Sequence, residues 1–526
     1  MPKCAVPHMV ASSKGWLMIR KVCLAALLLV LAAPLAALPP PQAEGGLFAR
    51  APCPASVQSE DGIECGVLTV PENRQRAGSR MIRLPVVIFR SHASAPAPDA
   101  VVFLPGGPGG SALARPLSVK NNPFLATRDY VLLEPRGAKL AQPSLGCLEI
   151  NALVGVIAAG HLSGKAADAA RVKAAMACRA DLVAKGIDLD GYTSAETARD
   201  IEDLRKALGY RQWNLFGLSY GTRLALTVLR DHPQGIRSVI LDSVLPPEAN
   251  FDEHATANLR RALDAVFNGC AVDTVCGSMY PHLAADFTEL VARADRHPLA
   301  MPGVSGSDGR AVTVRGAQVV AALYDALHAP SAIGRIPAVI EDSLDGRTTE
   351  LAGLVKADQG PSSFTWGLRL SVWCAEEAPF ENPSRVEQQV SPAWGLGGID
   401  ERTASPAVCR AWNVAAAAPS ENVAVISDVP VLVFAGEYDP DTPPEWARGL
   451  IPHIPNARVV TFPGQSHGAG FNPCGAAIAT AFLHDPGGSL PLDCVLKMHG
   501  TAFTTSGGAK EEGQRRGHEK TKRPTP

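Results

Sequence analysis

The chain has 526 residues, of which 46% are hydrophobic and 19% are charged, and its formal net charge is −2 at pH 7. This length exceeds one ordinary domain, although a single α/β core with a large insertion also fits it. The near-neutral charge argues against a nucleic acid as the main partner, because phosphate binding needs a basic face. The apolar content is typical of a globular protein with a sizeable core.

The first 43 residues have the features of an export signal followed by a linker. Arg20-Lys21 precede an apolar run from Val22 to Ala33, and Pro34 and small residues follow it. An uncleaved membrane anchor is the alternative, but Pro34 and the short apolar run disfavour it. We therefore expect a secreted, periplasmic or cell-envelope protein that does not contact the membrane once the signal is removed.

The cysteines support export. Setting Cys4 and Cys23 aside leaves ten of the twelve cysteines, and an even number in an exported chain indicates disulfides. Connectivity is open in the sequence, and our prediction pairs each cysteine with its neighbour, most firmly Cys270 with Cys276. A metal site is the rival interpretation, but paired C-x-x-C spacing and clustered histidines are missing. We expect no metal and no other cofactor.

Apolar and β-branched runs predict the strands of a mostly parallel sheet covered by helices on both faces. In chain order these runs are Ile63–Val70, Ile82–Phe89, Ala100–Leu104, Tyr130–Leu133, Trp213–Phe216, Ser238–Asp242, Val429–Phe434 and Arg458–Phe462. The sequence Thr193-Ser-Ala-Glu196 is typical of a helix start, and helical spacing continues from it until Gly209.

The pattern predicts a core in two parts, residues 44–245 and 428–498, with a cap inserted between them. Amphipathic helical stretches cover 259–267, 283–294 and 317–327, and no strong strand pattern interrupts them. Residues 246–427 are therefore predicted to form a mainly helical cap. Residues 499–526 are rich in Gly, Lys and Glu, which predicts a disordered tail.

The pentapeptide Gly217-Leu218-Ser219-Tyr220-Gly221 lies between a predicted strand and a predicted helix. This order is the context of a nucleophile elbow, in which a tight turn projects the serine hydroxyl above the sheet edge. A Gly/Ser-rich turn without chemistry has the same composition, so the prediction depends on the partners of the serine. A serine hydroxyl needs a base that takes its proton and a third group that orients the base.

The expected partners follow in the order acid, then histidine, each directly after a strand. Asp439 follows the strand 429–434, and His467 follows the strand 458–462. Three groups at three strand ends predict the triad Ser219, Asp439 and His467. Asp242 also follows a strand and is the alternative acid, whereas Asp441 is expected to cap the turn at Thr442-Pro443.

The developing oxyanion needs backbone N–H donors, one of them from the residue after the serine. Tyr220 is that residue, and the loop Gly106-Gly107-Pro108-Gly109-Gly110 follows an earlier strand in the position of the second donor. Among its glycines we favour Gly107. A phosphate-cradling loop is excluded, because the Lys-Ser/Thr of a P-loop is missing.

With these motifs in place, the chain resembles the prolyl and tripeptidyl aminopeptidase branch of the α/β-hydrolases, especially exported bacterial tripeptidyl-aminopeptidase-like proteins. The matching segments span nearly the whole mature chain: Leu104-Pro-Gly-Gly-Pro-Gly109, Glu134-Pro-Arg-Gly137, Trp213–Thr222, Gly436–Pro443 and Gly464-Gln-Ser-His-Gly468. The resemblance implies Ser219, Asp439 and His467 as the triad and hydrolysis near a free peptide N-terminus. Glu134 departs from the pattern, because relatives often carry Asp there.

A free N-terminus is an ammonium group, which fixed carboxylates can neutralise. Cap glutamates do this in relatives, so Glu376 or Glu377 is the predicted anchor, and a solvated acidic pair is the plain alternative. The sequence thus predicts an exported serine exopeptidase that cleaves peptides with a free N-terminus through an acyl-enzyme. An esterase or lipase on the same fold and a non-catalytic binding protein are the alternatives.

Overall fold

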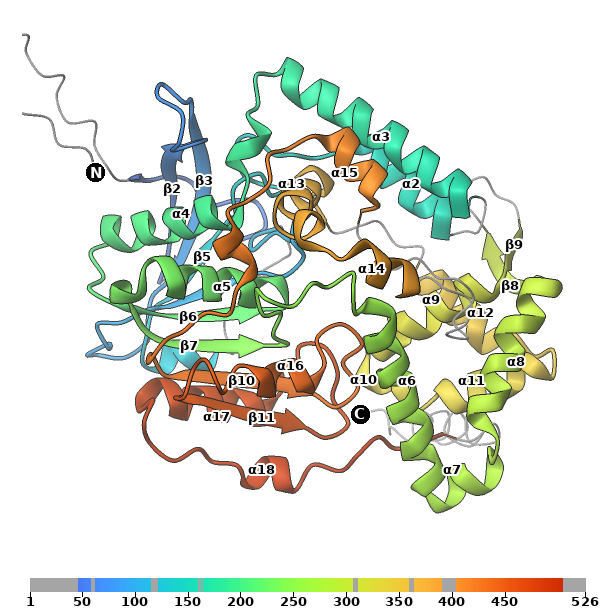
Figure 1. Cartoon of the computed structure of the whole chain (residues 1–526). Coiled ribbons are helices and arrows are strands. Elements are labelled where there is room, and N and C mark those ends of the chain that lie inside the picture. Colours follow the sequence, from blue (N-terminus) through green and yellow to red (C-terminus); the bar gives the residue numbers. More distant parts are fainter. Residues whose placement is uncertain are drawn as a thin grey trace, which may run out of the picture. The chain divides into compact units, whose positions relative to one another are not determined.

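The computed structural model describes residues 46–57, 62–114, 122–158, 162, 164–305, 311–358, 364–389 and 404–504. Its centre is a nine-stranded sheet in the order β1-β2-β3-β5-β4-β6-β7-β10-β11 (Figure 1). These strands are β1 (Leu47–Arg50), β2 (Ile63–Pro71), β3 (Met81–Phe89), β4 (Val101–Leu104), β5 (Tyr130–Leu133), β6 (Trp213–Leu218), β7 (Ile236–Asp242), β10 (Val431–Gly436) and β11 (Ala457–Phe462).

The sheet is antiparallel from β1 through β3 to β5 and parallel from β5 to β11. All eight predicted strands are present, seven of them with shifted ends, which confirms the α/β fold class. The short edge strand β1 was not predicted, because most of its four side chains are exposed and leave no apolar run. In Figure 1 the arrowheads of β6, β7 and β11 point toward the same end of the sheet.

Neighbouring residues of each central strand pack on opposite faces of the sheet. Val102 and Leu215 belong to a hydrophobic cluster with residues of α4 and α5, whereas Val101 and Phe216 belong to a cluster with residues of α17. The helices that flank these strands are α4 (Ser194–Ala207), α5 (Tyr220–Asp231), α16 (Pro444–Gly449) and α17 (Pro473–His484). Burial on both faces is the reason that the parallel strands are continuously apolar.

The predicted capping sequence starts α4. The Thr193 hydroxyl oxygen accepts a hydrogen bond from the backbone N–H of Glu196 at 3.2 Å, which satisfies one of the free donors at the helix start. Beyond the last turn, Gly209 has a φ of +79°, a conformation that favours glycine.

Most of the chain between β7 and β10 is helical, as predicted, but it also contains a hairpin. Its helices are α6 (Ala255–Val272), α7 (Thr274–Met279), α8 (Leu283–Arg296), α9 (Gly316–Leu327), α10 (Pro330–Ile333), α11 (Ile336–Leu344), α12 (Thr349–Asp358), α13 (Trp366–Glu376), α14 (Pro383–Gln389) and α15 (Pro406–Trp412). The expectation that no strand interrupts them is wrong, because β8 (Leu299–Ser305) pairs antiparallel with β9 (Ala311–Val314). Pro302 and Gly303 break the apolar run of β8 and conceal it in the sequence.

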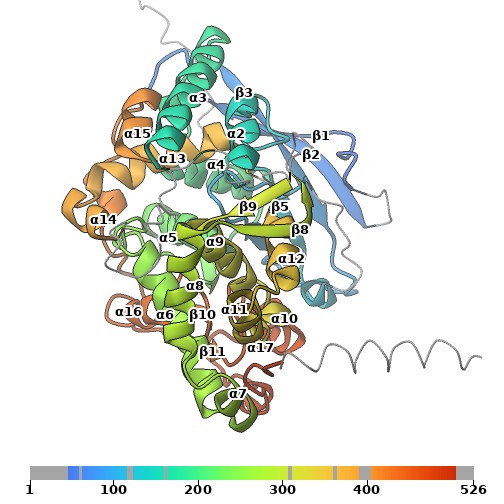
Figure 2. The same cartoon turned by 90° about the vertical axis from the view of Figure 1, so that its right-hand side faces the viewer.

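The inserted segment packs into two different hydrophobic clusters. Residues of α6 to α12 form a cluster with the hairpin, whereas residues of α13 and α15 join the main cluster of the core. There they lie next to α3 (Gly164–Ala184), which follows α2 (Leu148–Ala158) (Figure 2). We use the name cap for residues 255–389, which include the helices α6 to α14.

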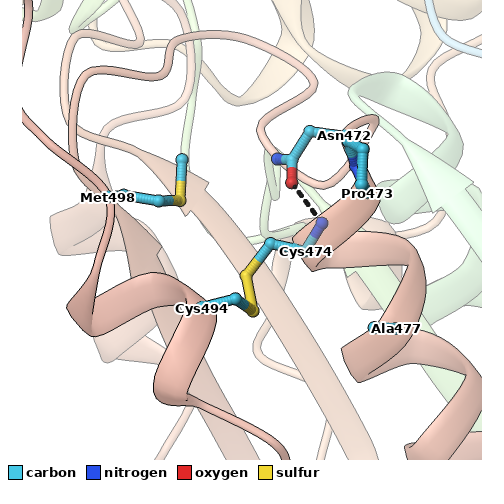
Figure 3. A pocket seen from close by; sticks show the side chains of 6 residues that line it. All are labelled: Asn472, Pro473, Cys474, Ala477, Cys494 and Met498. Atoms are coloured by element: carbon cyan, nitrogen blue, oxygen red, sulfur yellow. Dashed lines mark hydrogen bonds between the residues drawn. A yellow bond between two sulfur atoms is a disulfide. The ribbon is translucent and has the colours of Figure 1, made fainter.

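Five disulfides join neighbouring cysteines, which confirms the predicted pairing. They are Cys53–Cys65, Cys147–Cys178, Cys270–Cys276, Cys374–Cys409 and Cys474–Cys494. The last of these ties α17 to α18 (Asp493–Leu496) and lines a shallow apolar pocket with Asn472, Ala477 and Met498 (Figure 3). None of the predicted site residues lines this pocket.

The predicted tail begins with residues that contact the cap. Thr504 N donates a hydrogen bond to Gly334 O at 3.0 Å, and Phe503 packs against the cap cluster. The remainder of the predicted tail and the predicted signal segment lie outside the described residues. Within the part of the chain that the structure describes, no helix combines the length and apolarity needed to cross a membrane.

Disulfide removal should destabilise the protein according to the loop that each bridge closes. The chain-entropy relation predicts a loss of about 4 kcal/mol in the free energy of unfolding when Cys374 and Cys409, 35 residues apart, are both replaced by alanine. The matched control replaces Cys270 and Cys276 by alanine. Their disulfide closes a loop of only 6 residues, so this variant should lose about 2 kcal/mol in the free energy of unfolding. Urea unfolding of both variants measures the difference, and a larger loss for the shorter loop would contradict it.

Candidate active site

Ser219 lies at a tight turn between β6 and α5. Its φ of +57° and ψ of −127° fall in a region that residues other than glycine rarely occupy, as expected of a nucleophile elbow. A side chain at Gly221 would collide with the carbonyl oxygen of Leu104 at the end of β4, and one at Gly217 would collide with the carbonyl of Gly221. The two glycines therefore allow α5 to start directly against the sheet.

The glycine loop after β4 runs past Ser219. A Cβ atom at Gly106 would lie 3.0 Å from Ser219 Cβ, so a side chain there would crowd the serine. Gly107, the favoured oxyanion donor, follows with a φ of +127°, and Tyr220, the other predicted donor, is the first residue of α5. The first N–H groups of a helix have no partner within it, which leaves that of Tyr220 free for this role.

An arginine of the cap holds the glycine loop. Arg369, in α13, donates a hydrogen bond from Nη1 to Gly107 O at 2.8 Å. Its guanidinium lies 4.7 Å from the ring centre of Phe364 and 5.4 Å from that of Trp373, in cation–π geometry. The carbonyl of Gly107 is thus fixed by the cap, which was not anticipated from the sequence.

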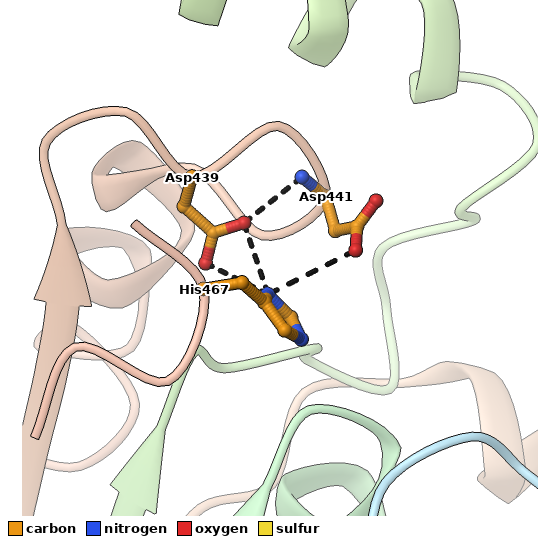
Figure 4. Close-up of side chains that lie close together, drawn as sticks. All are labelled: Asp439, Asp441 and His467. Atoms are coloured by element: carbon orange, nitrogen blue, oxygen red, sulfur yellow. Dashed lines mark hydrogen bonds and ion pairs between the residues drawn. The ribbon is translucent and has the colours of Figure 1, made fainter. Parts of the chain in front are cut away.

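Asp439 and His467 are hydrogen-bonded to each other, as predicted (Figure 4). His467 Nδ1 lies 3.1 Å from Asp439 Oδ1 and 3.0 Å from Oδ2. Asp439 is fully buried and also accepts hydrogen bonds from Asp441 N at 2.9 Å, Thr442 N at 2.9 Å and Thr442 Oγ1 at 2.7 Å. These donors fix the carboxylate and stabilise its charged form.

The electrostatics of this pair favour a carboxylate and an imidazolium. Burial acts to raise the pKa of Asp439, but the charge of His467 and its hydrogen bond outweigh it and lower that pKa below its ordinary value. Burial acts to lower the pKa of His467, but the charge and hydrogen bond of Asp439 outweigh burial and raise this pKa to about 9. Asp439 thus stabilises the proton that a general base must accept.

The loop that carries His467 lies beside the serine turn. Gly468 N donates to Ser243 Oγ at 2.8 Å, and a Cβ atom at Gly468 would lie 3.7 Å from Leu218 Cδ1, one residue before Ser219. Ser219 and His467 both lie in the part of the chain that the structure describes, and no hydrogen bond within 3.5 Å joins the serine hydroxyl to the histidine ring. Such catalytic hydrogen bonds are often long in substrate-free enzymes and shorten in the complex.

Asp242, the alternative acid, supports the histidine loop instead of the imidazole. Its Oδ2 accepts a hydrogen bond from Gly470 N at 2.9 Å, and its side chain is fully buried. Burial raises the pKa of Asp242 to about 7. Because His467 Nδ1 bonds to Asp439, the geometry favours Asp439 as the acid.

Asp441 does not cap the adjacent turn, contrary to the expectation from the sequence. Its Oδ1 accepts a hydrogen bond from Tyr324 Oη at 2.6 Å, and its Oδ2 lies 2.9 Å from His328 Nε2. Both partners come from the cap, Tyr324 from α9 and His328 from the residue after it. Neither residue lies in a motif, so the sequence did not predict these partners.

Glu376 and Glu377, the predicted anchors of the substrate N-terminus, lie in the interior at the end of α13. Glu376 accepts hydrogen bonds from Ser194 N and Ser194 Oγ, both at 2.6 Å, and Glu377 forms a short ion pair with Arg223 of α5. Burial raises the pKa of each glutamate to about 7. These contacts account for both carboxylates as ties between α13, α4 and α5, and ammonium binding stays a prediction.

Glu134, the expected departure from the family pattern, lies buried beside the glycine loop. Its carboxylate accepts hydrogen bonds from Ser111 Oγ at 2.8 Å, Leu140 N at 2.9 Å and Leu113 N at 3.2 Å. Ser111 directly follows the glycine loop, so Glu134 holds the far end of that loop.

Three side chains of the site are close enough to share a cation. Ligand atoms of Asp439, Asp441 and His467 lie within 4.8 Å of one another. The hydrogen bonds of Asp439 with His467 and of Asp441 with His328 already use these atoms. The arrangement therefore fits an acid–base pair, and nothing in its donor set requires a metal.

Comparison with known proteins identifies the family. The alpha/beta hydrolase fold family matches residues 99–472, more than half of the 526 residues. The chain therefore belongs to the α/β-hydrolases, which confirms the predicted fold and family.

Several curated relatives carry peptidase names. The tripeptidyl aminopeptidase of Streptomyces lividans is 26% identical over 463 residues, which cover 80% of this chain and 81% of that protein. The serine protease Hip1 of Mycobacterium tuberculosis is 25% identical over 482 residues, which cover 84% and 89%. A solved proline iminopeptidase from Mycobacterium smegmatis is 17% identical with a TM-score of 0.36, and the match covers 80% of this chain and 98% of that one. The predicted resemblance to the tripeptidyl-aminopeptidase branch is confirmed.

The charge state of His467 can be measured directly. We expect its ring to titrate near pH 9 in the wild-type protein, because the Asp439 carboxylate stabilises the imidazolium. In the Asp439→Asn variant the midpoint should fall well below the wild-type value, because the strongest stabilising charge and its hydrogen bond are removed. Burial still lowers the pKa of the ring, and only the charges of Asp441 and Asp242 remain to raise it. NMR of ¹⁵N-labelled histidine, assigned with His467→Gln, gives both midpoints. A wild-type midpoint below 6.5 would contradict the interpretation.

Proposed function

We propose that this protein is an exported serine exopeptidase that releases short N-terminal peptides or single amino acids through an acyl-enzyme. The fold and the relatives support a peptidase of the α/β-hydrolase family. The observation that carries the proposal is the Asp439–His467 pair beside a serine held in strained backbone geometry.

In the proposed mechanism Ser219 Oγ attacks the carbonyl carbon of the scissile peptide bond. His467 Nε2 takes the hydroxyl proton and later donates it to the leaving amine, while Asp439 holds Nδ1 and stabilises the imidazolium. The backbone N–H groups of Gly107 and Tyr220 stabilise the oxyanion of the tetrahedral intermediate. Water then attacks the ester with His467 as the base, which releases the acyl product and restores the serine.

The cap supports a restricted substrate. It reaches the site from two sides, through Arg369 at the glycine loop and through Tyr324 and His328 at the acid loop. A cap in contact with both loops would let only the end of a peptide chain reach the site, as an exopeptidase requires. Two relatives are named tripeptidyl aminopeptidase and serine protease, which favours peptides over simple esters as substrates.

Export rests on the cysteines and the N-terminal sequence. Five disulfides fit an oxidising compartment, because cytosolic thiols are kept reduced. The predicted signal segment precedes the described residues.

Two aspartate variants distinguish the acid of the triad. Asp439→Asn should lower kcat by about 10⁴-fold, because the imidazole loses the partner that holds its tautomer. Asp242→Asn is the matched control, since it lies in the same region but bonds to Gly470, and its loss should be at least a hundredfold smaller than the first. Turnover of a chromogenic peptide measures both variants, and a larger loss for Asp242→Asn would reverse the assignment.

Serine-directed labelling tests the reaction class itself. A fluorophosphonate should label the folded wild-type protein and fail to label Ser219→Ala. Absence of labelling in folded wild-type protein would favour a non-catalytic binding protein.

Substrates with free and blocked N-termini test the glutamates and separate an exopeptidase from an esterase. An exopeptidase should cleave aminoacyl, dipeptidyl or tripeptidyl chromogenic substrates and lose activity when their N-terminus is blocked. If Glu376 or Glu377 binds the ammonium group, its change to glutamine should raise KM about tenfold or more for free-amine peptides and spare p-nitrophenyl esters. Equal effects on both substrates would assign the pair to the structural role that its contacts indicate.

A further inference from the structure

Next to the Asp439–His467 pair lies a second pair of a histidine and a carboxylate. His328 and Asp441 form it, and the ring centres of His328 and His467 are 5.6 Å apart with an angle of 66° between the rings. Asp441 Oδ2 is 2.9 Å from His328 Nε2 but also 3.9 Å from His467 Nδ1 (Figure 4 shows the latter contact). Asp441 thus stands between the two imidazoles.

The hydrogen bonds of His328 define its charge. Its Nδ1 lies 3.0 Å from the backbone oxygen of Tyr324, and its Nε2 faces the Asp441 carboxylate. Both neighbours accept hydrogen bonds, so both ring nitrogens must carry a proton, and the ring is a cation. His467 differs, because only its Nδ1 faces carboxylates and its Nε2 is left for the serine.

Asp441 would disturb the site without this cation. A carboxylate 3.9 Å from His467 Nδ1 is a second acceptor for the proton that Asp439 should hold, and its charge stabilises the imidazolium further. The cap engages both of its oxygens, Oδ1 through the Tyr324 hydroxyl and Oδ2 through His328. His328 thereby matches the negative charge at Oδ2, the oxygen that also lies 3.9 Å from His467 Nδ1.

Other charged groups face this cluster as well. Asp242 lies under the histidine loop, Arg261 of α6 donates to Asp439 O at 2.6 Å, and Arg369 of α13 acts on Asp441 electrostatically. These groups surround the cluster. Among the described cationic groups, His328 is the one that forms a hydrogen bond with the Asp441 carboxylate.

We propose that His328 is a positioning residue of the cap, which with Tyr324 binds Asp441 and leaves Asp439 as the single carboxylate partner of His467. The proposal rests on the proposed function of Ser219, Asp439 and His467. It gives the cap a second task, because a cap that moves away from the acid loop would take this cation with it. Docking of the cap and the basicity of His467 are therefore coupled. The direction of the pKa of His328 agrees: burial acts to lower it, but the Asp441 charge outweighs burial and raises it.

The test compares His328→Gln, Asp441→Asn and the double variant. In His328→Gln the charge of Asp441 is uncompensated, so the acidic limb of the pH profile of kcat/KM should move up by about one pH unit. On that limb kcat/KM falls about tenfold, while the plateau at high pH is kept. In Asp441→Asn and in the double variant the limb should lie at or below the wild-type position, because the charge that His328 compensates is gone.

A purely structural role for His328 gives a different result. It predicts an activity loss that is equal at all pH values, or a limb shift that persists in the double variant, and either outcome overturns the proposal. His484→Gln is the matched control for loss of a histidine, since His484 is exposed at the end of α17 and its change should not move the limb.

The NMR midpoint of His467 in His328→Gln separates this inference from the proposed function. It should rise by about one pH unit relative to wild type even if the protein hydrolyses none of the substrates. An unchanged midpoint would refute the role of His328 and leave the triad in place. Absence of hydrolysis together with a raised midpoint would refute the function and leave the role of His328 in place.

Discussion

The site depends on the parallel pairing of the central strands. Leu218 at the end of β6 is paired with Asp242 at the end of β7, and Asp242 is paired with Phe434 in β10. This register brings the loops after β6, β7 and β10 to one edge of the sheet, and β4 and β11 align with them. Backbone hydrogen bonds therefore place Ser219, Asp439 and His467 within one region, although 248 residues (467 − 219) separate the first from the last. Ligand sites of open α/β sheets lie at this carboxyl edge for the same reason.

A second constraint is the burial of several carboxylates in this region. A buried charge is unfavourable unless it is paired or hydrogen-bonded, and the chain meets this condition differently for each group. Asp439 accepts hydrogen bonds from its own loop and from His467, whereas Asp441 takes its partners from the cap. Glu377 is paired with Arg223 in the helix that the serine turn begins. Asp242, with a single backbone donor at good distance, has a pKa raised by burial toward neutrality.

The cap is part of the site and does more than cover it. Arg369 fixes the carbonyl of Gly107, while Tyr324 and His328 fix the side chain of Asp441. Arg369 comes from α13, whose apolar residues join the main core cluster. Tyr324 and His328 come from the end of α9, whose apolar residues join the cap cluster. Both the glycine loop and the acid loop thus depend on how the inserted helices pack on the core.

The sequence alone determined the sheet and the pairs of cysteines, and it predicted the three residues of the proposed triad at the strand ends. Local rules suffice there: apolar runs define buried strands, the glycines define the serine turn, and chain order defines acid and base. It did not reveal the hairpin β8–β9, the contacts of residues 501–504, or the ties of Glu376 and Glu377, which were predicted to bind the substrate N-terminus, with a solvated acidic pair as the alternative. Those depend on which elements pack together, and an acidic pair has the same letters whether water or Arg223 faces it.

The partners of Asp441 show the same limit most clearly. His328 lies 113 residues before Asp441, in a helix end with no motif, and only the packing of the cap on the core brings the two to 2.9 Å. Position in the sequence therefore predicted which groups form the proposed triad. Tertiary structure decided which charges surround them, because electrostatic interactions act through space and not along the chain.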